Sequence, residues 1–153
     1  MCIRDRISGA INVFKQLSPK TKIIGIEPKG APSMSKSINK NKLITLNRID
    51  GFVDGVAVKK VGKYSFDYCK EYLDDLIILD ENEICNSILE LKSYENIITE
   101  PAGAMSSAAL RHYRHKIINK NIGCIICGAN NDNSRMPEII KRADIWKSNN
   151  PKN

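Results

Sequence analysis

The alternation of strand-like and helix-like patterns along the chain predicts an α/β fold, with a mainly parallel, twisted sheet flanked by helices. Short β-branched apolar runs bounded by turn residues, such as residues 22–28, suit the buried strands of a parallel sheet. Between these runs, apolar residues recur at the spacing of amphipathic helices. The 153 residues are enough for one domain with a substantial core.

The first half of the chain predicts a helix, a strand and a second helix. The first helix ends at Pro19, and one face of it carries Ile7, Ala10, Ile11, Phe14 and Leu17. Residues 22–28 follow as a strand closed by a proline. Ser33 is then expected to cap a helix that starts near Met34. Residues 50–62 contain three glycines and two Asp-Gly pairs, which predict turns.

The middle of the chain repeats this order. A helix capped by Ser65 is predicted from an apolar face formed by Phe66, Cys69, Leu73 and Leu76. Residues 76–81 suit a strand, and residues 83–92 suit another helix. The inward face of that helix comprises Ile84, Ile88 and Leu91.

The last third begins with a Pro-Ala-Gly turn at residues 101–103, which leads into a helix of small residues. Residues 122–127 are predicted to form a strand. A loop and a final helix follow, with Pro137 in the first turn, where proline is tolerated. No apolar run approaches the roughly 20 residues that span a bilayer, and the N-terminus shows no signal-peptide pattern. We therefore expect a cytoplasmic protein that does not associate with membranes.

The formal net charge of +7 raises the alternative of a nucleic-acid-binding module. The lysines, however, are scattered along the chain, and no aromatic residues alternate with them to form a stacking surface. We interpret the charge as a compositional bias and expect no nucleic-acid partner.

Two of the five cysteines, Cys69 and Cys85, occupy apolar helix positions and are expected to be small core residues. Cys124 and Cys127 have C-x-x-C spacing and follow His112 and His115, which keeps a zinc-binding module open as an alternative. In a strand, however, positions three apart point to opposite faces, so we expect no metal there and treat Cys124 as a core residue.

Cys127 stands at the carboxyl end of the predicted strand, directly before Gly128. Ligands of open α/β sheets bind outside the carboxyl ends of the strands. A small polar side chain followed by a glycine turn is therefore well placed to contact a cofactor.

Four segments, "IIGIEPKGAPSM", "DGVAVKKVG", "EPAGA" and "CGANNDNSRMPEI", together resemble the threonine dehydratases in order and spacing. The similarity runs from about residue 7 to residue 145. It implies the large domain of the tryptophan-synthase-β type fold (fold type II) and the cofactor pyridoxal 5'-phosphate. It also implies β-elimination from L-threonine to 2-oxobutanoate and ammonia in isoleucine biosynthesis, with an amino acid as substrate and a homo-oligomer as the full-length assembly.

The resemblance assigns roles to three residues. Cys127 matches the position that hydrogen-bonds the pyridine nitrogen, which is usually serine in threonine dehydratases and cysteine in some serine dehydratases. Gly55 matches a backbone segment that approaches the cofactor ring, and Glu100 matches a carboxylate near the ring. The alternatives are a turn glycine for Gly55 and a helix N-terminal acid for Glu100.

A divalent-cation site of the related serine racemases has two matches, Glu27 and Ala31. Its third ligand there is an aspartate, and Ser33 stands in that place. We therefore predict no metal at these three positions.

The family's Schiff-base lysine and its phosphate-binding glycine loop have no counterpart in the chain, so no catalytic residue is assigned. We expect residues 1–6, "MCIRDR", to be a non-native start because they match a translated transposon-end adapter. Residues 7–146 are then a partial large domain, and residues 147–153 a tail. The isolated chain is expected to be inactive.

Three alternatives stay open. The first is a fragment of a serine dehydratase or serine racemase, which shares the fold and the cofactor. The second is the zinc- or nucleic-acid-binding module, and the third is a non-catalytic paralogue.

Overall fold

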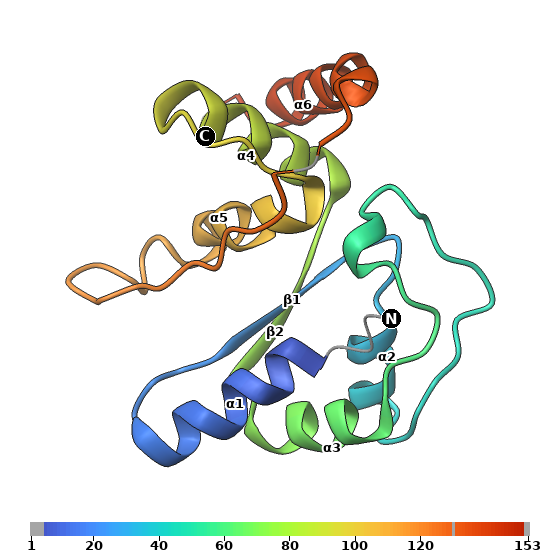
Figure 1. Ribbon diagram of the computed structural model, residues 1–153, viewed down its shortest axis with the longest axis vertical. Coiled ribbons are helices and arrows are strands. Elements are labelled where there is room, and N and C mark those ends of the chain that lie inside the picture. The colour runs from blue at the N-terminus through green and yellow to red at the C-terminus, as the bar shows by residue number, and fades with distance from the viewer. Residues whose placement is uncertain (1–4, 130, 152–153) are drawn as a thin grey trace. The chain divides into compact units, whose positions relative to one another are not determined.

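The computed structural model describes residues 5–129 and 131–151, which form two compact units. Unit 1 contains residues 5–51 and 55–78, and unit 2 contains residues 52–54 and the chain from residue 79 onward. Unit 1 combines helices with strands, whereas the elements of unit 2 are helical apart from the last residue of a strand (Figure 1). The predicted α/β class is confirmed.

Unit 1 is built around a small parallel sheet of two strands, β1 and β2, which are neighbours in the sheet although two α-helices and a 3-10 helix separate them in sequence. Helix α1 and helix α2 both pack against helix α3. The elements are α1 (Asp5–Leu17), β1 (Ile24–Pro28), α2 (Ser33–Asn39), the 3-10 helix η1 (Asp54–Val56), α3 (Lys63–Tyr72) and β2 (Asp75–Leu79). These bounds confirm that two strands and three helices lie in this part of the chain. The face predicted for the third helix is wrong at its end, because Leu73 follows α3 and Leu76 lies in β2.

The core of unit 1 lies where α1, α2 and α3 meet. Ile11 of α1 is fully buried there, with Met34, Val61, Phe66 and Cys69. The face predicted for α1 is therefore only partly inward, because Phe14 is 45% exposed and Leu17 is 81% exposed. Cys69 is 1% exposed, which confirms it as a small core residue.

The predicted helix caps are wrong. Ser33 and Ser65 lie inside the first turns of α2 and α3, and the residues that precede these helices are Pro32 and Gly62. The amide groups at the start of α2 instead donate to Glu27: Met34 N to Oε1 at 2.9 Å and Ser35 N to Oε2 at 2.8 Å. A local pattern cannot show this arrangement, because Glu27 caps the helix from the end of β1.

Asp74 ties the start of β2 to β1. Its Oδ2 accepts hydrogen bonds from Ile23 N at 2.8 Å and from Lys15 Nζ at 3.0 Å. The Ile23 amide, and after it the Lys15 ammonium, hold the pKa of Asp74 below its ordinary value. The ionised carboxylate therefore stabilises the folded state.

We expect Asp74→Asn to lower the free energy of unfolding by about 1 kcal/mol at pH 7, since a partly exposed charged hydrogen bond is lost. The folded pKa lies below the unfolded pKa of about 4, so the contribution is present above pH 4 and is lost as the pH falls through the folded pKa. Urea unfolding should show a difference in the free energy of unfolding between wild type and variant that is smaller at pH 3 than at pH 7. Asp67→Asn, which removes an exposed partner of Lys63, is the control. Its free energy of unfolding should stay close to that of the wild type at both pH values.

Unit 2 is a helical layer in which α4 packs against both α5 and α6. Its elements are α4 (Glu81–Tyr94), α5 (Pro101–Tyr113), the 3-10 helix η2 (Asn133–Arg135) and α6 (Met136–Asn149). The inward face predicted for α4 is confirmed, since Ile84, Ile88 and Leu91 are at most 6% exposed. Cys85 beside them is fully buried, and burial raises the pKa of its thiol to about 12. Cys85 is therefore an inert core residue, as predicted.

The small residues of α5 allow close packing, because Ala104 and Ala108 are fully buried. The residues 101–103, predicted as a turn, are instead the first turn of the helix itself, with Pro101 at its start. Proline fits there because the amide that it lacks would have no partner inside the helix. The proline in the first turn of α6 is placed as predicted.

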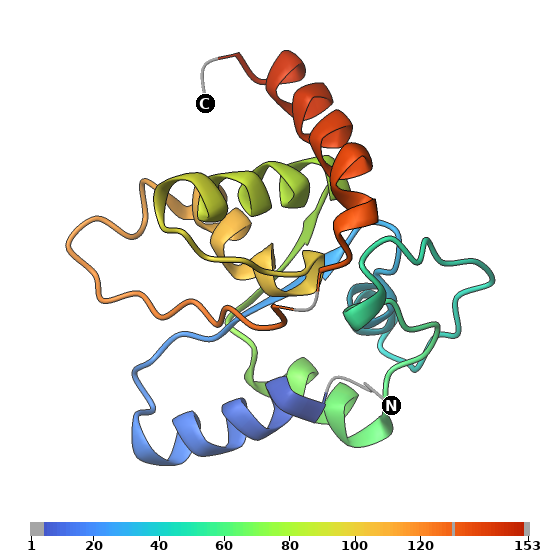
Figure 2. The same cartoon turned by 45° about the horizontal axis from the view of Figure 1, so that its top comes forward.

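The predicted strand at residues 122–127 is wrong. After α5 the chain runs out into a long irregular loop and returns alongside the helix (Figure 2). A strand is defined by backbone hydrogen bonds to a neighbouring strand, and among the described residues only β1 and β2 pair in this way. Ile125 is accordingly 73% exposed. None of the described helices combines the length and apolarity that crossing a membrane requires.

Candidate functional site

Two predicted site residues, Glu100 and Cys127, come together at the start of α5. The returning loop is fixed there by two hydrogen bonds. The Glu100 amide donates to the carbonyl oxygen of Gly128, and Thr99 Oγ1 donates to the carbonyl oxygen of Cys127 at 2.9 Å. The backbone that follows the Cys127 side chain is therefore anchored to one helix terminus through two successive carbonyl groups.

Gly103 makes this close approach possible. A Cβ atom at position 103 would overlap the carbonyl oxygen of Cys127 and the hydroxyl of Thr99, and it would lie 2.8 Å from the Cys127 carbonyl carbon. Such contacts are far too short for any side chain. The first turn of α5 therefore needs glycine at this position so that the loop can lie against it.

Gly128 is the second glycine that the site requires. Its φ of 74° lies in the left-handed region, where L-residues are strained. A Cβ atom here would also overlap the carboxylate group of Glu100. The Glu100 side chain therefore lies directly over the turn that follows Cys127. The same residue precedes α5, and its carbonyl oxygen accepts the amides of Gly103 and Ala104 at 3.0 and 3.2 Å.

The two cysteines of the C-x-x-C pair have different surroundings. Cys124 Sγ donates a long hydrogen bond, 3.7 Å, to the carbonyl oxygen of Ser106 in α5, and burial raises the pKa of its thiol. Ser106 Oγ in turn donates to the carbonyl oxygen of Ile125 at 2.7 Å. Cys124 is half-buried, so it is less enclosed than the predicted core residue. Cys127 is also half-buried, with its backbone held as described above.

Gly55, the third predicted site residue, lies in the 3-10 turn η1 and is partly buried. It is described with unit 1, whereas Glu100 and Cys127 belong to unit 2. The structure therefore brings together two of the three predicted residues and describes the third in its own unit.

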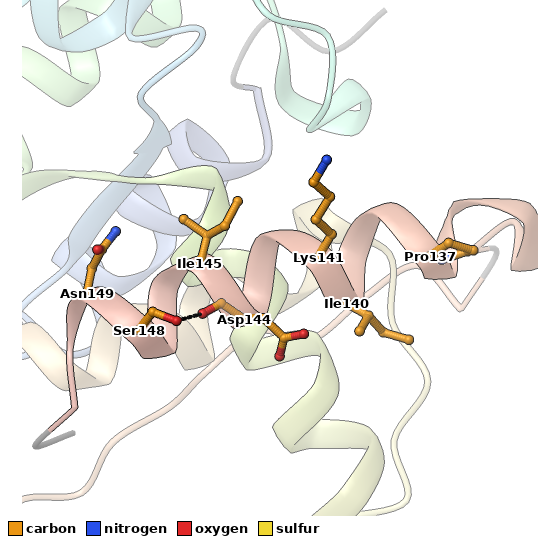
Figure 3. A pocket seen from close by; sticks show the side chains of 7 residues that line it. All are labelled: Pro137, Ile140, Lys141, Asp144, Ile145, Ser148 and Asn149. Atoms are coloured by element: carbon orange, nitrogen blue, oxygen red, sulfur yellow. Dashed lines mark hydrogen bonds between the residues drawn. The ribbon is translucent and has the colours of Figure 1, made fainter.

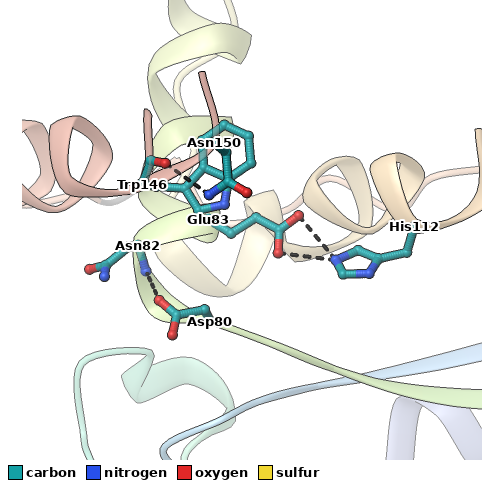
Figure 4. Close-up of polar contacts among 6 residues, drawn as sticks. All are labelled: Asp80, Asn82, Glu83, His112, Trp146 and Asn150. Atoms are coloured by element: carbon teal, nitrogen blue, oxygen red, sulfur yellow. Dashed lines mark hydrogen bonds and ion pairs between the residues drawn. The ribbon is translucent and has the colours of Figure 1, made fainter. Parts of the chain in front are cut away.

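The residues of the zinc alternative are engaged elsewhere or dispersed. His112 Nε2 lies 3.1 Å from both carboxylate oxygens of Glu83, whose side chain is 8% exposed (Figure 4). This contact joins α5 to the first turn of α4, where Asp80 caps the helix by accepting the Asn82 amide at 2.9 Å. In the part of the chain that the structure describes, no three His, Cys, Asp or Glu side chains are grouped to hold a metal ion.

A hollow of about 600 Å³ lies along α6, away from the residues predicted for the site (Figure 3). All of its lining residues belong to that one helix, among them Lys141, Asp144 and Ile145. The Ser148 hydroxyl on this face donates to the carbonyl oxygen of Asp144 at 2.8 Å. The hollow is the outer face of a helix, with Ile140 and Ile145 both more than 40% exposed.

Three residues of the site were missed by the sequence analysis. Thr99, Gly103 and Ser106 hold the returning loop against α5, but nothing in their local pattern identifies them as anchors. The one available signal was the unusual run of small residues in "PAGAMSSAA". It predicts close packing without naming the partner.

Comparison with known proteins assigns the chain to a family. Residues 5–128 match the family described as pyridoxal-phosphate dependent enzyme. A biosynthetic L-threonine dehydratase of Halalkalibacterium halodurans is 45% identical over 141 residues, which are 92% of this chain and 34% of that protein. The corresponding protein of Staphylococcus epidermidis is 49% identical over 142 residues, with the same coverage. The chain thus spans about a third of the length of these relatives.

Solved structures show the same similarity. The processed form of threonine deaminase isoform 2 from Solanum lycopersicum has a TM-score of 0.83 at 36% identity, and the match covers 91% of this chain and 39% of that one. A maize serine racemase has a TM-score of 0.77 at 26% identity, with 89% and 44% covered.

Proposed function

We propose, on the ground that the chain belongs to the family of pyridoxal-phosphate dependent enzymes, that it forms part of a threonine dehydratase. The full protein would convert L-threonine to 2-oxobutanoate and ammonia by β-elimination and would serve isoleucine biosynthesis. The identity of 45–49% to two biosynthetic L-threonine dehydratases supports this assignment. The structural observation that supports it is the clamp at the start of α5, in which Thr99, Glu100 and Gly103 hold the backbone of Cys127 and Gly128.

The residues of the clamp fit a pyridine ring. The thiol of Cys127 is a small hydrogen-bonding group, and the carbonyl groups that follow it are held at the start of α5. Such a group suits a contact to a ring nitrogen. Gly128 has no side chain, and this lets the Glu100 carboxylate lie over the turn that follows Cys127. Pyridoxal phosphate, when bound, supplies the electron sink for the reaction.

The side chains of this chain would then set the properties of the site. A neutral thiol at position 127 cannot keep a proton on the pyridine nitrogen as a carboxylate would, which favours elimination over transamination. Glu100 would place a negative charge near the ring, and the backbone at Gly55 would lie along it. These three roles are proposals that rest on the resemblance and, for Cys127 and Glu100, on their juxtaposition in unit 2.

The proposal is tested with a hybrid dehydratase, in which the 141 matched residues of the Halalkalibacterium halodurans relative are replaced by those of this chain. We expect the hybrid to release 2-oxobutanoate from L-threonine at a rate within about tenfold of its parent. The 153-residue chain alone, in which the resemblance assigns no catalytic lysine, should release none. A correctly folded hybrid that binds the cofactor but does not act on threonine would contradict the proposal.

Substitutions at Cys127 test its role in the same hybrid. Cys127→Ser keeps a hydrogen-bonding group of similar size and should change kcat/KM by less than about threefold. Cys127→Ala removes the group and should lower kcat/KM about tenfold, the value of one modest hydrogen bond. Cys124→Ala is the matched control and should behave as the unsubstituted hybrid. Equal kcat/KM values for Cys127→Ala and the unsubstituted hybrid would contradict the proposed role of Cys127 in the site.

The serine dehydratase or serine racemase alternative makes a different prediction for the hybrid. L-serine would then be turned over or racemised faster than L-threonine is deaminated. Family membership favours an enzyme over the zinc- or nucleic-acid-binding alternative. The homo-oligomeric state and the cytoplasmic location of the full protein stay predictions.

A further inference from the structure

Arg135 and Arg142 hold a short strap of unit 2 that leads directly into Gly55. The strap consists of residues 52–54, which belong to unit 2 although the residues on either side belong to unit 1. Phe52 is 7% exposed and Val53 is 1% exposed, so the first two residues of the strap are buried, whereas Asp54 is exposed.

The contacts to the strap come from Arg135, directly before α6, and from Arg142 within it. Arg135 Nη2 donates to the carbonyl oxygen of Phe52 at 2.6 Å, and its guanidinium lies 4.8 Å from the centre of the Phe52 ring. Arg135 Nη1 is 3.9 Å from Asp54 Oδ1. Arg142, two helical turns further on, places its guanidinium 4.2 Å from the same ring. Arg135 thus contacts the strap through backbone, ring and carboxylate, and Arg142 through the ring alone.

The same arginine stands at the end of the segment that carries Cys127. Gly128 turns the chain in the left-handed conformation, and Asp132 then caps η2 by accepting the Ser134 amide at 2.9 Å. Arg135 is the last residue of η2. The segment 127–135 therefore has one end clamped to the start of α5 and the other clamped to the strap that precedes Gly55.

From these contacts, and resting on the proposed function, we propose that Arg135 is a positioning residue for the cofactor. It holds the strap so that the backbone at Gly55 keeps a fixed place for the ring. Arg142 supports the Phe52 ring without directing the backbone. The forked guanidinium is needed because it bonds the carbonyl oxygen while lying on the ring, which an ammonium cannot do equally well.

The test compares Arg135→Lys and Arg135→Met with Arg142→Met in the hybrid dehydratase. For both Arg135 variants, hydrogen exchange of the amides at residues 52–56 should rise about tenfold, while those at residues 99–104 stay unchanged. The dissociation constant of pyridoxal phosphate, measured by fluorescence, should also rise about tenfold, with kcat at saturating cofactor changed less than threefold. Arg142→Met should change exchange and cofactor affinity less than threefold.

Each outcome is decisive. Unchanged exchange in the Arg135 variants would overturn the role of Arg135 in holding the strap. Faster exchange with unchanged cofactor affinity would overturn its role in positioning the cofactor. A hybrid that fails to bind the cofactor with Arg135 intact would contradict the proposed function instead, and exchange at residues 52–56 would still decide whether Arg135 holds the strap.

Discussion

Gly103→Ala is expected to destabilise unit 2 by about 3 kcal/mol or more, because one added methyl group overlaps two anchors of the returning loop. The carbonyl oxygen of Cys127 and the hydroxyl of Thr99 both occupy the space that the Cβ atom would need. Backbone atoms cannot move aside as the end of a flexible side chain can. The loop must therefore leave the helix terminus, and the hydrogen bond from Thr99 is lost with it.

The same substitution at Gly9 is the matched control. Gly9 also lies in a helix, α1, but a Cβ atom there would meet nothing within 4 Å. Gly9→Ala should stabilise the chain by about 0.5–1 kcal/mol, since alanine is the better helix former. Urea unfolding followed by circular dichroism measures both variants. Changes in the free energy of unfolding that have the same sign in both variants would contradict the clamp. A loss of less than about 1 kcal/mol for Gly103→Ala would contradict it as well.

The second large effect is expected at Glu27. Its carboxylate accepts the two amides at the start of α2, and the residue is 1% exposed. Glu27→Ala leaves both amides without this acceptor, the Met34 amide buried and the Ser35 amide partly buried, at a cost of about 1–3 kcal/mol each. Glu27→Gln keeps one acceptor oxygen and should lose about half as much. Urea unfolding at pH 7 gives the three free energies.

Added Mg²⁺ distinguishes a helix-capping role of Glu27 from a cation-binding role. Because both carboxylate oxygens are already bonded to α2, we expect millimolar Mg²⁺ to leave the free energy of unfolding of the wild type unchanged. A rise with Mg²⁺ that Glu27→Ala abolishes would show a cation site instead. A loss of less than about 1 kcal/mol in the free energy of unfolding for Glu27→Ala would contradict the capping role of Glu27.

The helices could be predicted because each carries its own pattern. Ile84, Ile88 and Leu91 recur at helical spacing, and the structure buries all three. The caps could not be predicted, because Glu27 reaches α2 from a different element. The strand at residues 122–127 failed for a related reason: an apolar β-branched run becomes a strand only beside a paired neighbour, and among the described residues β1 and β2 pair with each other.

The candidate site was predictable only in part. The resemblance selected Cys127 and Glu100 separately, and the structure places the Glu100 carboxylate over the turn after Cys127. The clamp itself depends on Gly103 and Thr99, which meet Cys127 only after the long loop returns to α5. Contacts across such a loop leave no periodicity in the sequence. Arg135 was likewise invisible, since its partner Phe52 lies 83 residues away.

The proposal that pyridoxal phosphate binds beside Cys127 is tested most directly by measuring whether the bound cofactor protects this cysteine from an alkylating reagent. In the hybrid dehydratase, labelling of Cys127 and Cys124 is followed by mass spectrometry before and after pyridoxal phosphate is restored. We predict that a cofactor concentration about ten times the dissociation constant slows labelling of Cys127 about tenfold and leaves Cys124 unchanged. Equal labelling of Cys127 with and without bound cofactor would contradict a cofactor site beside Cys127.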